Sequence, residues 1–302
     1  MIYLYGVLLP SFRDVSVDLT PWGLPHTSLF VRMYAANNLA ITGNKAFKLW
    51  PYLISCSPGE TVLSWGGAFS NHLLALSAAA ATLGLKSIGI VRGDEPGLDN
   101  AWLRAMKNNG MHLHFVSRNA YQNRNDNEYS LALANSLGAS KVIPEGGKGL
   151  LGIQGASEMV RCNEPYELIA LCGGTGTTAA GIARKLAPEN KKVICLQALK
   201  GKGIIWDELQ QSSGLTRAEL QNLTVFDDLN FGRFGQIHRE AEAFGDQFFR
   251  HTGIELDKVY GKKGLLGLIQ LMRIGDLPSD KSMLYIHTGG LEPKLIHSSF
   301  VV

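Results

Sequence analysis

A lysine stands where a predicted helix begins, and its amine could react with an aldehyde. Gly43 and Asn44 come directly before Lys45. Glycine permits an unusual backbone angle and asparagine can cap a helix, so the amine would lie near the positive end of the helix dipole. That position favours the neutral amine, which is the form that makes a Schiff base. A surface lysine that opens an ordinary helix would give the same pattern.

A second polar group follows an apolar strand. The stretch GGAFSNH (residues 66–72) joins a predicted strand to a helix that begins at Asn71. Backbone N–H groups at a helix N-terminus point toward an anion such as a carboxylate, and Ser70 could donate or relay a proton. Serine and asparagine are also preferred caps, so a purely structural loop explains this block, taken alone, slightly better. We expect His72 beside a ligand pocket rather than on a metal.

The strongest local signal is the stretch CGGTGTTAAG (residues 172–181). Glycines let the backbone approach a phosphate, hydroxyls add donors, and the following helix adds its N-terminus. The stretch lacks the Gly-Lys-Ser/Thr ending of a nucleotide P-loop. A dinucleotide site would need an early Gly-x-Gly and an acidic residue about 20 positions later, where Gln197 stands. A phosphate monoester therefore fits better. The candidate residues are Gly174, Thr175, Gly176, Thr177 and Thr178.

Two further candidates are weaker. Tyr260 comes just before a predicted helix, and Thr288 follows the last predicted strand. A half-buried aromatic residue and an ordinary turn residue would explain them as well.

Composition excludes several classes of function. A net charge of +3 with scattered basic residues argues against nucleic-acid binding. The four cysteines form no Cys-x-x-Cys pair, which argues against a zinc site or a disulfide framework and favours a reducing compartment. The N-terminus resembles no signal peptide, and no run approaches the roughly 18 apolar residues of a membrane span. We therefore expect a cytoplasmic protein without a metal.

The elements that must position these residues alternate between strands and helices. This order predicts parallel sheets covered by helices on both faces, with the loops that follow the strands gathered along one edge. The polar tract 117–130 is the most loop-like stretch, or a helix with a frayed start. The predicted strands are 61–65, 87–93, 111–116, 141–147, 166–174, 191–199 and 282–290, and the predicted helices are 71–84, 99–109, 128–137, 152–160, 177–186, 236–251 and 265–274.

Taken in order, these blocks resemble the 1-aminocyclopropane-1-carboxylate deaminase / D-cysteine desulfhydrase family. These are pyridoxal 5'-phosphate enzymes of the tryptophan-synthase-β-like fold (fold type II), and the resemblance runs from about residue 28 to residue 291. It implies an α/β protein with two open, mostly parallel twisted sheets covered by helices, and the cofactor between two domains. Residues 1–50 and 150–302 would form the large cofactor-binding domain, and residues 51–149 the small one. A homodimer is the family's usual assembly.

The resemblance assigns roles to the candidates. GNKAFKL (residues 43–49) is similar to the family's lysine block, which makes Lys45 the Schiff-base lysine and Lys48 a phosphate contact. Ser70 becomes the residue that binds the substrate carboxylate and handles protons, and Asn71 the partner of the cofactor's phenolic oxygen. Residues 174–178 resemble the family's phosphate-binding loop.

The C-terminal blocks extend these assignments. Tyr260 matches the family's active-site tyrosine, and LYIHTGG (residues 284–290) resembles its last core strand. There Thr288 could contact the ring nitrogen of the cofactor. The implied substrate site comprises Ser70, Asn71, His72, Phe234 and Tyr260.

The departures bear on the substrate. Gly261 stands where the deaminases have a glutamate and the desulfhydrases a threonine, and Phe234 replaces a second tyrosine. Phe47 and Phe69 replace an arginine and a glutamine, and residues 36–39 replace an Asp-Asp-Leu motif. These changes argue against cyclopropane ring opening and for a more apolar pocket.

The reaction that we expect is β-elimination from a small amino acid, as in D-cysteine desulfhydrase. The amino acid would displace Lys45, which then removes the α-proton with help from Ser70 or Tyr260. A leaving group such as a thiol would depart, and a keto acid and ammonia would follow. Cyclopropane ring opening, a catalytically silent cofactor-binding protein and a nicotinamide dehydrogenase are the alternatives.

Overall fold

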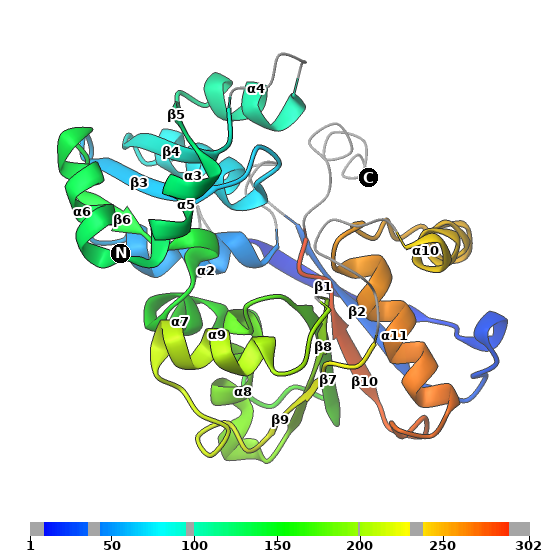
Figure 1. Ribbon diagram of the computed structural model, residues 1–302. Coiled ribbons are helices and arrows are strands. Elements are labelled where there is room, and N and C mark those ends of the chain that lie inside the picture. Colours follow the sequence, from blue (N-terminus) through cyan, green and yellow to red (C-terminus); the bar gives the residue numbers. More distant parts are fainter. Residues whose placement is uncertain (1–8, 36–42, 95–99, 199, 230–237, 290–302) are drawn as a thin grey trace. The chain divides into compact units, whose positions relative to one another are not determined.

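The computed structural model describes the chain except for residues 1–8, 36–42, 95–99, 199, 230–237 and 290–302 (Figure 1). Its packing divides the described residues into two compact units. One contains residues 43–152, and the other contains residues 11–35 and 153–289. Each unit has its own sheet and its own apolar core.

The first unit is built on a parallel sheet of four strands in the order β5-β4-β3-β6. Successive side chains of a strand point to opposite faces, and here both faces are buried. Val62 packs with α2, α3 and α4, whereas Leu63 and Trp65 pack with α5 and α6. The elements are α2 (Asn44–Leu53), β3 (Thr61–Gly66), α3 (Asn71–Thr82), β4 (Lys86–Arg92), α4 (Ala101–Asn108), β5 (His112–Val116), α5 (Arg118–Gln122), α6 (Asn127–Ser136) and β6 (Lys141–Ile143).

The second unit has a sheet of six strands in the order β1-β2-β10-β7-β8-β9. Strand β1 pairs antiparallel with β2, and the other pairs are parallel. Helices α10 and α11 pack on this sheet through an apolar cluster that includes Phe248, Leu265 and Ile269. The elements are β1 (Ser11–Val17), β2 (Leu29–Ala35), β7 (Leu168–Gly173), α8 (Thr177–Leu186), β8 (Lys192–Gln197), α9 (Ile204–Ser213), β9 (Leu223–Phe226), α10 (Arg239–Thr252), α11 (Gly261–Arg273) and β10 (Met283–Ile286), and α7 (Leu150–Ser157) crosses the boundary between the units.

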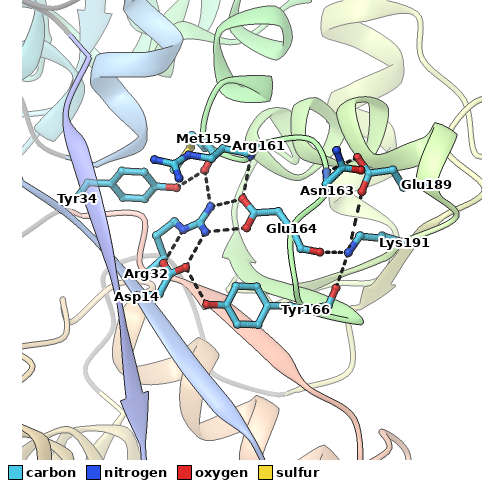
Figure 2. A network of polar contacts seen from close by, with 10 residues as sticks. All are labelled: Asp14, Arg32, Tyr34, Met159, Arg161, Asn163, Glu164, Tyr166, Glu189 and Lys191. Carbon is cyan, nitrogen blue, oxygen red and sulfur yellow. Dashed lines mark hydrogen bonds and ion pairs between the residues drawn. The ribbon is translucent and has the colours of Figure 1, made fainter.

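A buried polar network connects β1 and β2 to the segment that follows α7 (Figure 2). Arg32 donates to both oxygens of Asp14, at 2.7 and 2.8 Å, and to both oxygens of Glu164, at 2.6 and 2.9 Å. The hydroxyl of Tyr34 donates to the carbonyl of Met159 at 2.7 Å. Arg32 is 1% exposed, so its charge depends on these two carboxylates for compensation.

The structure confirms the predicted α/β class with mostly parallel sheets covered by helices. Strands β1, β2 and β9 and helix α9 were not predicted, and α11 begins at Gly261 instead of residue 265. The polar tract 117–130 is largely ordered into α5, a 3₁₀ turn and the start of α6.

The two units differ from the sequence-based domain division at one end. Helix α2 packs with α3 through Ala46, Leu49 and Leu53, so it groups with the four-stranded sheet. The division at residue 50 places most of this helix with the other domain instead. The assignment of a large cofactor-binding domain and a small one stays a prediction.

Candidate active site

Helix α2 presents the predicted Schiff-base lysine in its first turn. Gly43 is the N-cap, with φ 58° and ψ −147°, a backbone conformation that favours glycine. The prediction that Asn44 caps this helix is wrong, because Asn44 is already the first helical residue and the N-cap makes no side-chain bond. Lys45 follows it and is half-buried. Lys45 therefore belongs to the first turn of α2, as expected, at the end of the helix where the dipole is positive.

A second lysine of the same helix is in contact with the first. Lys48 is 3% exposed and interacts electrostatically with Lys45. Burial lowers the pKa of Lys48 well below its ordinary value, and the charges of Lys45 and Lys148 lower it further. Two neighbouring ammonium groups repel each other, and this repulsion favours the neutral form of a lysine. A desolvated amine beside another cation is a nucleophile at neutral pH.

Ser70 and Asn71 lie at the N-terminus of α3, as predicted. Ser70 is the N-cap, and its Oγ accepts a bond from the backbone N–H of Leu73 at 3.1 Å. A hydroxyl that accepts this bond still carries its own donor hydrogen. The Oδ1 of Asn71 accepts a bond from the indole Nε1 of Trp102 at 2.8 Å, and that indole packs edge-on against the exposed ring of Phe69.

His72 lies in the same group of residues. It is 3% exposed, and its Nε2 is 2.8 Å from the Oγ of Ser64. Burial first, and then the charges of Lys45 and Lys48, lower the pKa of His72 well below its ordinary value. Lys45, Lys48 and His72 therefore belong to the first unit, and the charges of the two lysines act on the imidazole.

In the second unit, the predicted phosphate-binding stretch joins β7 to α8. We call residues 173–178 the glycine–threonine loop. Gly176 is the N-cap of α8, with φ 73°, and makes no side-chain capping bond. The hydroxyls of Thr175 and Thr177 are 3.1 Å apart, and Thr178 is buried at the same helix end. Hydroxyl donors therefore gather at a helix N-terminus that no N-cap side chain covers.

The glycines of this loop are required by their neighbours. A Cβ at Gly173 would lie 2.7 Å from the Sγ of Cys195, and one at Gly176 would lie 2.6 Å from a methyl carbon of Ile205. Backbone N–H groups, hydroxyls and the positive end of a helix dipole are the donors that a phosphate prefers. The residues present therefore fit the phosphate of pyridoxal 5'-phosphate.

Tyr260 is close to this loop in space although it is far away in sequence. A Cβ at Gly174 would lie 3.0 Å from the hydroxyl oxygen of Tyr260. The tyrosine immediately precedes α11, as predicted. Thr288 follows β10 and is 8% exposed. The structure thus brings Tyr260 to the glycine–threonine loop.

An acidic residue that was not among the predicted site residues lies beside Gly261. The carboxylate of Asp257 accepts backbone N–H bonds from Val259 at 3.0 Å, from Tyr260 at 2.8 Å and from Gly261 at 2.8 Å. A Cβ at Gly261 would lie 2.8 Å from Asp257 Oδ2 and 3.4 Å from His287 Nε2. An acid therefore reaches position 261 from four residues upstream. The available signal was an aspartate shortly before a predicted helix, since aspartate side chains often accept backbone N–H bonds of the residues that follow.

Burial shifts the pKa values of Asp257 and His287. It raises the pKa of Asp257, against the influence of His287 and the three backbone donors. Burial also lowers the pKa of His287, which is 3% exposed. Both pKa values therefore shift toward the neutral forms of the two side chains.

Two parts of the predicted site remain predictions. Phe234 lies outside the described residues. The lysine group belongs to one unit and the glycine–threonine loop with Tyr260 to the other, so their union in a single site is a prediction from the resemblance.

Comparison with known proteins tests that resemblance. A putative 1-aminocyclopropane-1-carboxylate deaminase of Pyrococcus horikoshii is 28% identical over 300 residues, which cover 91% of this chain and 91% of the relative. A D-cysteine desulfhydrase of Serratia proteamaculans is 27% identical over 293 residues, which cover 87% of this chain and 86% of the relative. The predicted resemblance is confirmed. It spans most of the chain and includes relatives named for both activities.

The solved structures confirm the fold. The crystal structure of a homologue of 1-aminocyclopropane-1-carboxylate deaminase superposes with a TM-score of 0.73 at 22% identity, and the match covers 99% of this chain and 98% of that one. No protein-family model matches the chain. No helix among the described residues is long and apolar enough to cross a membrane.

Proposed function

We propose that the chain is a pyridoxal 5'-phosphate-dependent lyase or deaminase of a small amino acid, with D-cysteine desulfhydrase-like β-elimination as its reaction. The observation that carries the proposal is the position of Lys45 in the first turn of α2, one turn before the buried Lys48. A neutral amine at this position can bond to the aldehyde of the cofactor. The relatives named for β-elimination and for deamination support the class of reaction.

The residues fit the cofactor at two places. Lys45 would hold its aldehyde carbon, and the glycine–threonine loop would hold its phosphate through the hydroxyls of Thr175, Thr177 and Thr178. Lys48 adds positive charge when it is protonated. The bound cofactor supplies an electron sink that makes the α-proton of an amino acid acidic.

The chain's own groups then handle the substrate and its protons. Ser70 donates its hydroxyl hydrogen to the substrate carboxylate while its oxygen stays bonded to the backbone of Leu73. The Nζ of Lys45, once neutral, takes the proton from the α-carbon. The hydroxyl of Tyr260 is a second group able to give or receive a proton, and it lies beside the loop that would bind the phosphate.

Ring-opening deamination of 1-aminocyclopropane-1-carboxylate is the second candidate. The relative from Pyrococcus horikoshii carries that name. In the sequence, glycine at position 261 counts against ring-opening deamination, because glycine offers no acidic side chain. The carboxylate of Asp257, which lies beside position 261, weakens that objection.

A direct assay separates these candidates. Purified full-length protein is loaded with pyridoxal 5'-phosphate and supplied either with D-cysteine or with 1-aminocyclopropane-1-carboxylate. Sulfide and pyruvate from D-cysteine would support the proposal, and 2-oxobutanoate from the cyclopropane substrate would support the second candidate. The Lys45→Ala variant should lose either activity, whereas Lys86→Ala, which changes an exposed lysine of the same unit, should not. Bound cofactor without any product would identify a catalytically silent protein.

We also propose a homodimer and a cytoplasmic location, both from the family resemblance. The chain has a mass of 32.8 kDa. Light scattering on the cofactor-loaded protein should therefore report about twice that mass, and the monomer mass would contradict the dimer.

A further inference from the structure

A cavity opens at the carboxyl edge of the four-stranded sheet in the first unit. Strands β3, β4 and β5 run parallel, so their carboxyl ends lie together at this edge. The cavity has a volume of about 510 Å³ and is lined by residues 67–69, 92–94 and 117–118, which stand at the ends of these three strands. Small-molecule sites commonly have volumes of about 300–1,000 Å³ and lie outside the carboxyl ends of parallel strands. We call it the strand-end cavity.

Two arginines from neighbouring strand ends give the strand-end cavity its charge. Arg92 is the last residue of β4 and is paired in the sheet with Val116 of β5, and Arg118 follows two residues later. Asp94 is the acid among the described lining residues, so the lining carries two positive charges and one negative charge. Both arginines are exposed, and neither forms an ion pair within the part of the chain that the structure describes.

Packing holds Arg92 in place without using its hydrogen-bond donors. The guanidinium carbon lies over the ring of the buried Tyr121, 5.7 Å from the ring centroid. The hydroxyl of Tyr121 donates to Glu145 at 2.6 Å, and Glu145 also accepts a bond from Nε of Arg124. The carboxylate of Glu145 is therefore engaged by two other donors. A guanidinium has five N–H donors, and those of Arg92 remain for a ligand.

The rest of the lining leaves room for the body of a ligand. A Cβ at Gly67 or at Gly93 would meet no atom within 4 Å, so both positions face open space. The ring of Phe69 is 69% exposed and packs edge-on against Trp102. An exposed aromatic ring beside two guanidiniums can cover the apolar part of a ligand whose anionic group binds the arginines.

We propose that the strand-end cavity binds a small organic anion, with a carboxylate or phosphate on Arg92 and Arg118 and an apolar body against Phe69. Arginine forms bidentate bonds to both of these anionic groups, whereas the two positive charges repel a cationic ligand. The inference goes beyond the proposed function and does not rest on it. The residues that carry it belong to one unit, and none of them is assigned to the cofactor or to the substrate.

Isothermal titration calorimetry of the full chain measures this binding. The protein is first saturated with pyridoxal 5'-phosphate, so that the glycine–threonine loop is occupied. The probes are phenyl phosphate, benzoate and the neutral benzyl alcohol, at low ionic strength. We expect an anion to bind roughly tenfold more tightly than benzyl alcohol, the gain of a charge-assisted bond, and to lose affinity as salt is added. The tighter of the two anions identifies the group that the arginines prefer. No binding of either anion, or equal binding of benzyl alcohol, would overturn the inference.

Variants locate the bound anion. Arg92→Ala and Arg118→Ala each remove one guanidinium and should weaken binding about tenfold, the loss of one charge-assisted bond. Asp94→Asn removes a carboxylate that repels the ligand and should strengthen binding about threefold. Lys86→Ala is the matched control, because Lys86 is exposed and begins the same strand at its opposite end. This control should change the affinity by less than about twofold.

The signs of these changes decide the inference. Equal weakening in Arg92→Ala and Lys86→Ala would assign the effect to net charge instead of the cavity and would overturn the inference, as would weaker binding in Asp94→Asn. Urea unfolding shows which variants fold, and Arg118→Ala decides should Arg92→Ala fail to fold. Failure of the protein to take up pyridoxal 5'-phosphate would refute the proposed function, whereas the comparison of variants would still decide the inference.

Discussion

Replacing Glu164 by glutamine tests how far the second unit depends on the buried charge of Arg32. The carboxylate of Glu164 accepts two bonds from the guanidinium, at 2.6 and 2.9 Å, and one from the backbone N–H of Arg161 at 2.8 Å. Glutamine keeps one acceptor oxygen but turns an amide N–H₂ toward a guanidinium N–H. One charge-assisted bond is therefore lost, and two donors face each other.

The expected loss of stability depends on the hydrogen bonds that Arg32 keeps in the variant. Breaking a buried ion pair by removing one partner costs about 3–5 kcal/mol, and a hydrogen bond to a charged group contributes about 1.5–3 kcal/mol. Arg32 keeps both bonds to Asp14, so its charge is not left without compensation. We therefore expect Glu164→Gln to lower the free energy of unfolding of this unit by about 2–3 kcal/mol.

Amide hydrogen exchange of β2 in increasing urea measures this loss within the second unit. Glu167→Gln is the matched control, because Glu167 pairs with Lys281 at the surface, where both side chains are about half exposed. Water screens an exposed pair, so the control should lose much less. Equal losses in the two variants, or a loss below about 1 kcal/mol in Glu164→Gln, would refute the argument that the buried network stabilises this unit.

Two further predictions concern packing and acid stability. Gly261→Ala places a methyl group 2.8 Å from an oxygen of Asp257 that a backbone N–H holds in place, so we expect a loss of about 1–3 kcal/mol in urea unfolding. Gly67→Ala meets no atom within 4 Å and is the control; a loss of the same size there would contradict the packing argument. At Asp14, burial raises the pKa, but the bonds from Arg32 and Tyr166 outweigh it and hold the pKa below 3.8. Its stabilisation is therefore present above that pH and is lost as the pH falls further. Asp14→Asn should lower the urea midpoint at pH 7 and flatten its decline below about pH 4, and an unchanged slope would count against this assignment.

The core strands could be predicted because parallel strands buried on both faces leave near-continuous apolar runs. Strand β1 leaves no such run. Its sequence, SFRDVSV, mixes polar and apolar residues without strict alternation, and it is held by antiparallel pairing with β2, a partner that sequence periodicity does not identify. The start of α11 was missed for a similar reason, because the backbone N–H of its first residue, Gly261, binds the carboxylate of Asp257, which lies outside the apolar pattern.

The residues of the candidate site likewise fall into two groups, those that the local sequence predicts and those that it does not. Lys45, Ser70 and the glycine–threonine loop could be found because each sits at a helix start marked by local residues. Their partners come from elsewhere in the chain. The indole N–H of Trp102 donates a hydrogen bond to the side-chain oxygen of Asn71, which lies 31 residues earlier in the chain. No local sequence pattern predicts that contact. Tertiary packing alone places such groups.

The most direct test of the account is chemical capture of the lysine that holds the cofactor. The full chain is loaded with pyridoxal 5'-phosphate, reduced with sodium borohydride, digested and examined by mass spectrometry. The account predicts a stable phosphopyridoxyl adduct on Lys45. An adduct on Lys48, which lies one turn further along the same helix, or no adduct at all, would contradict this prediction.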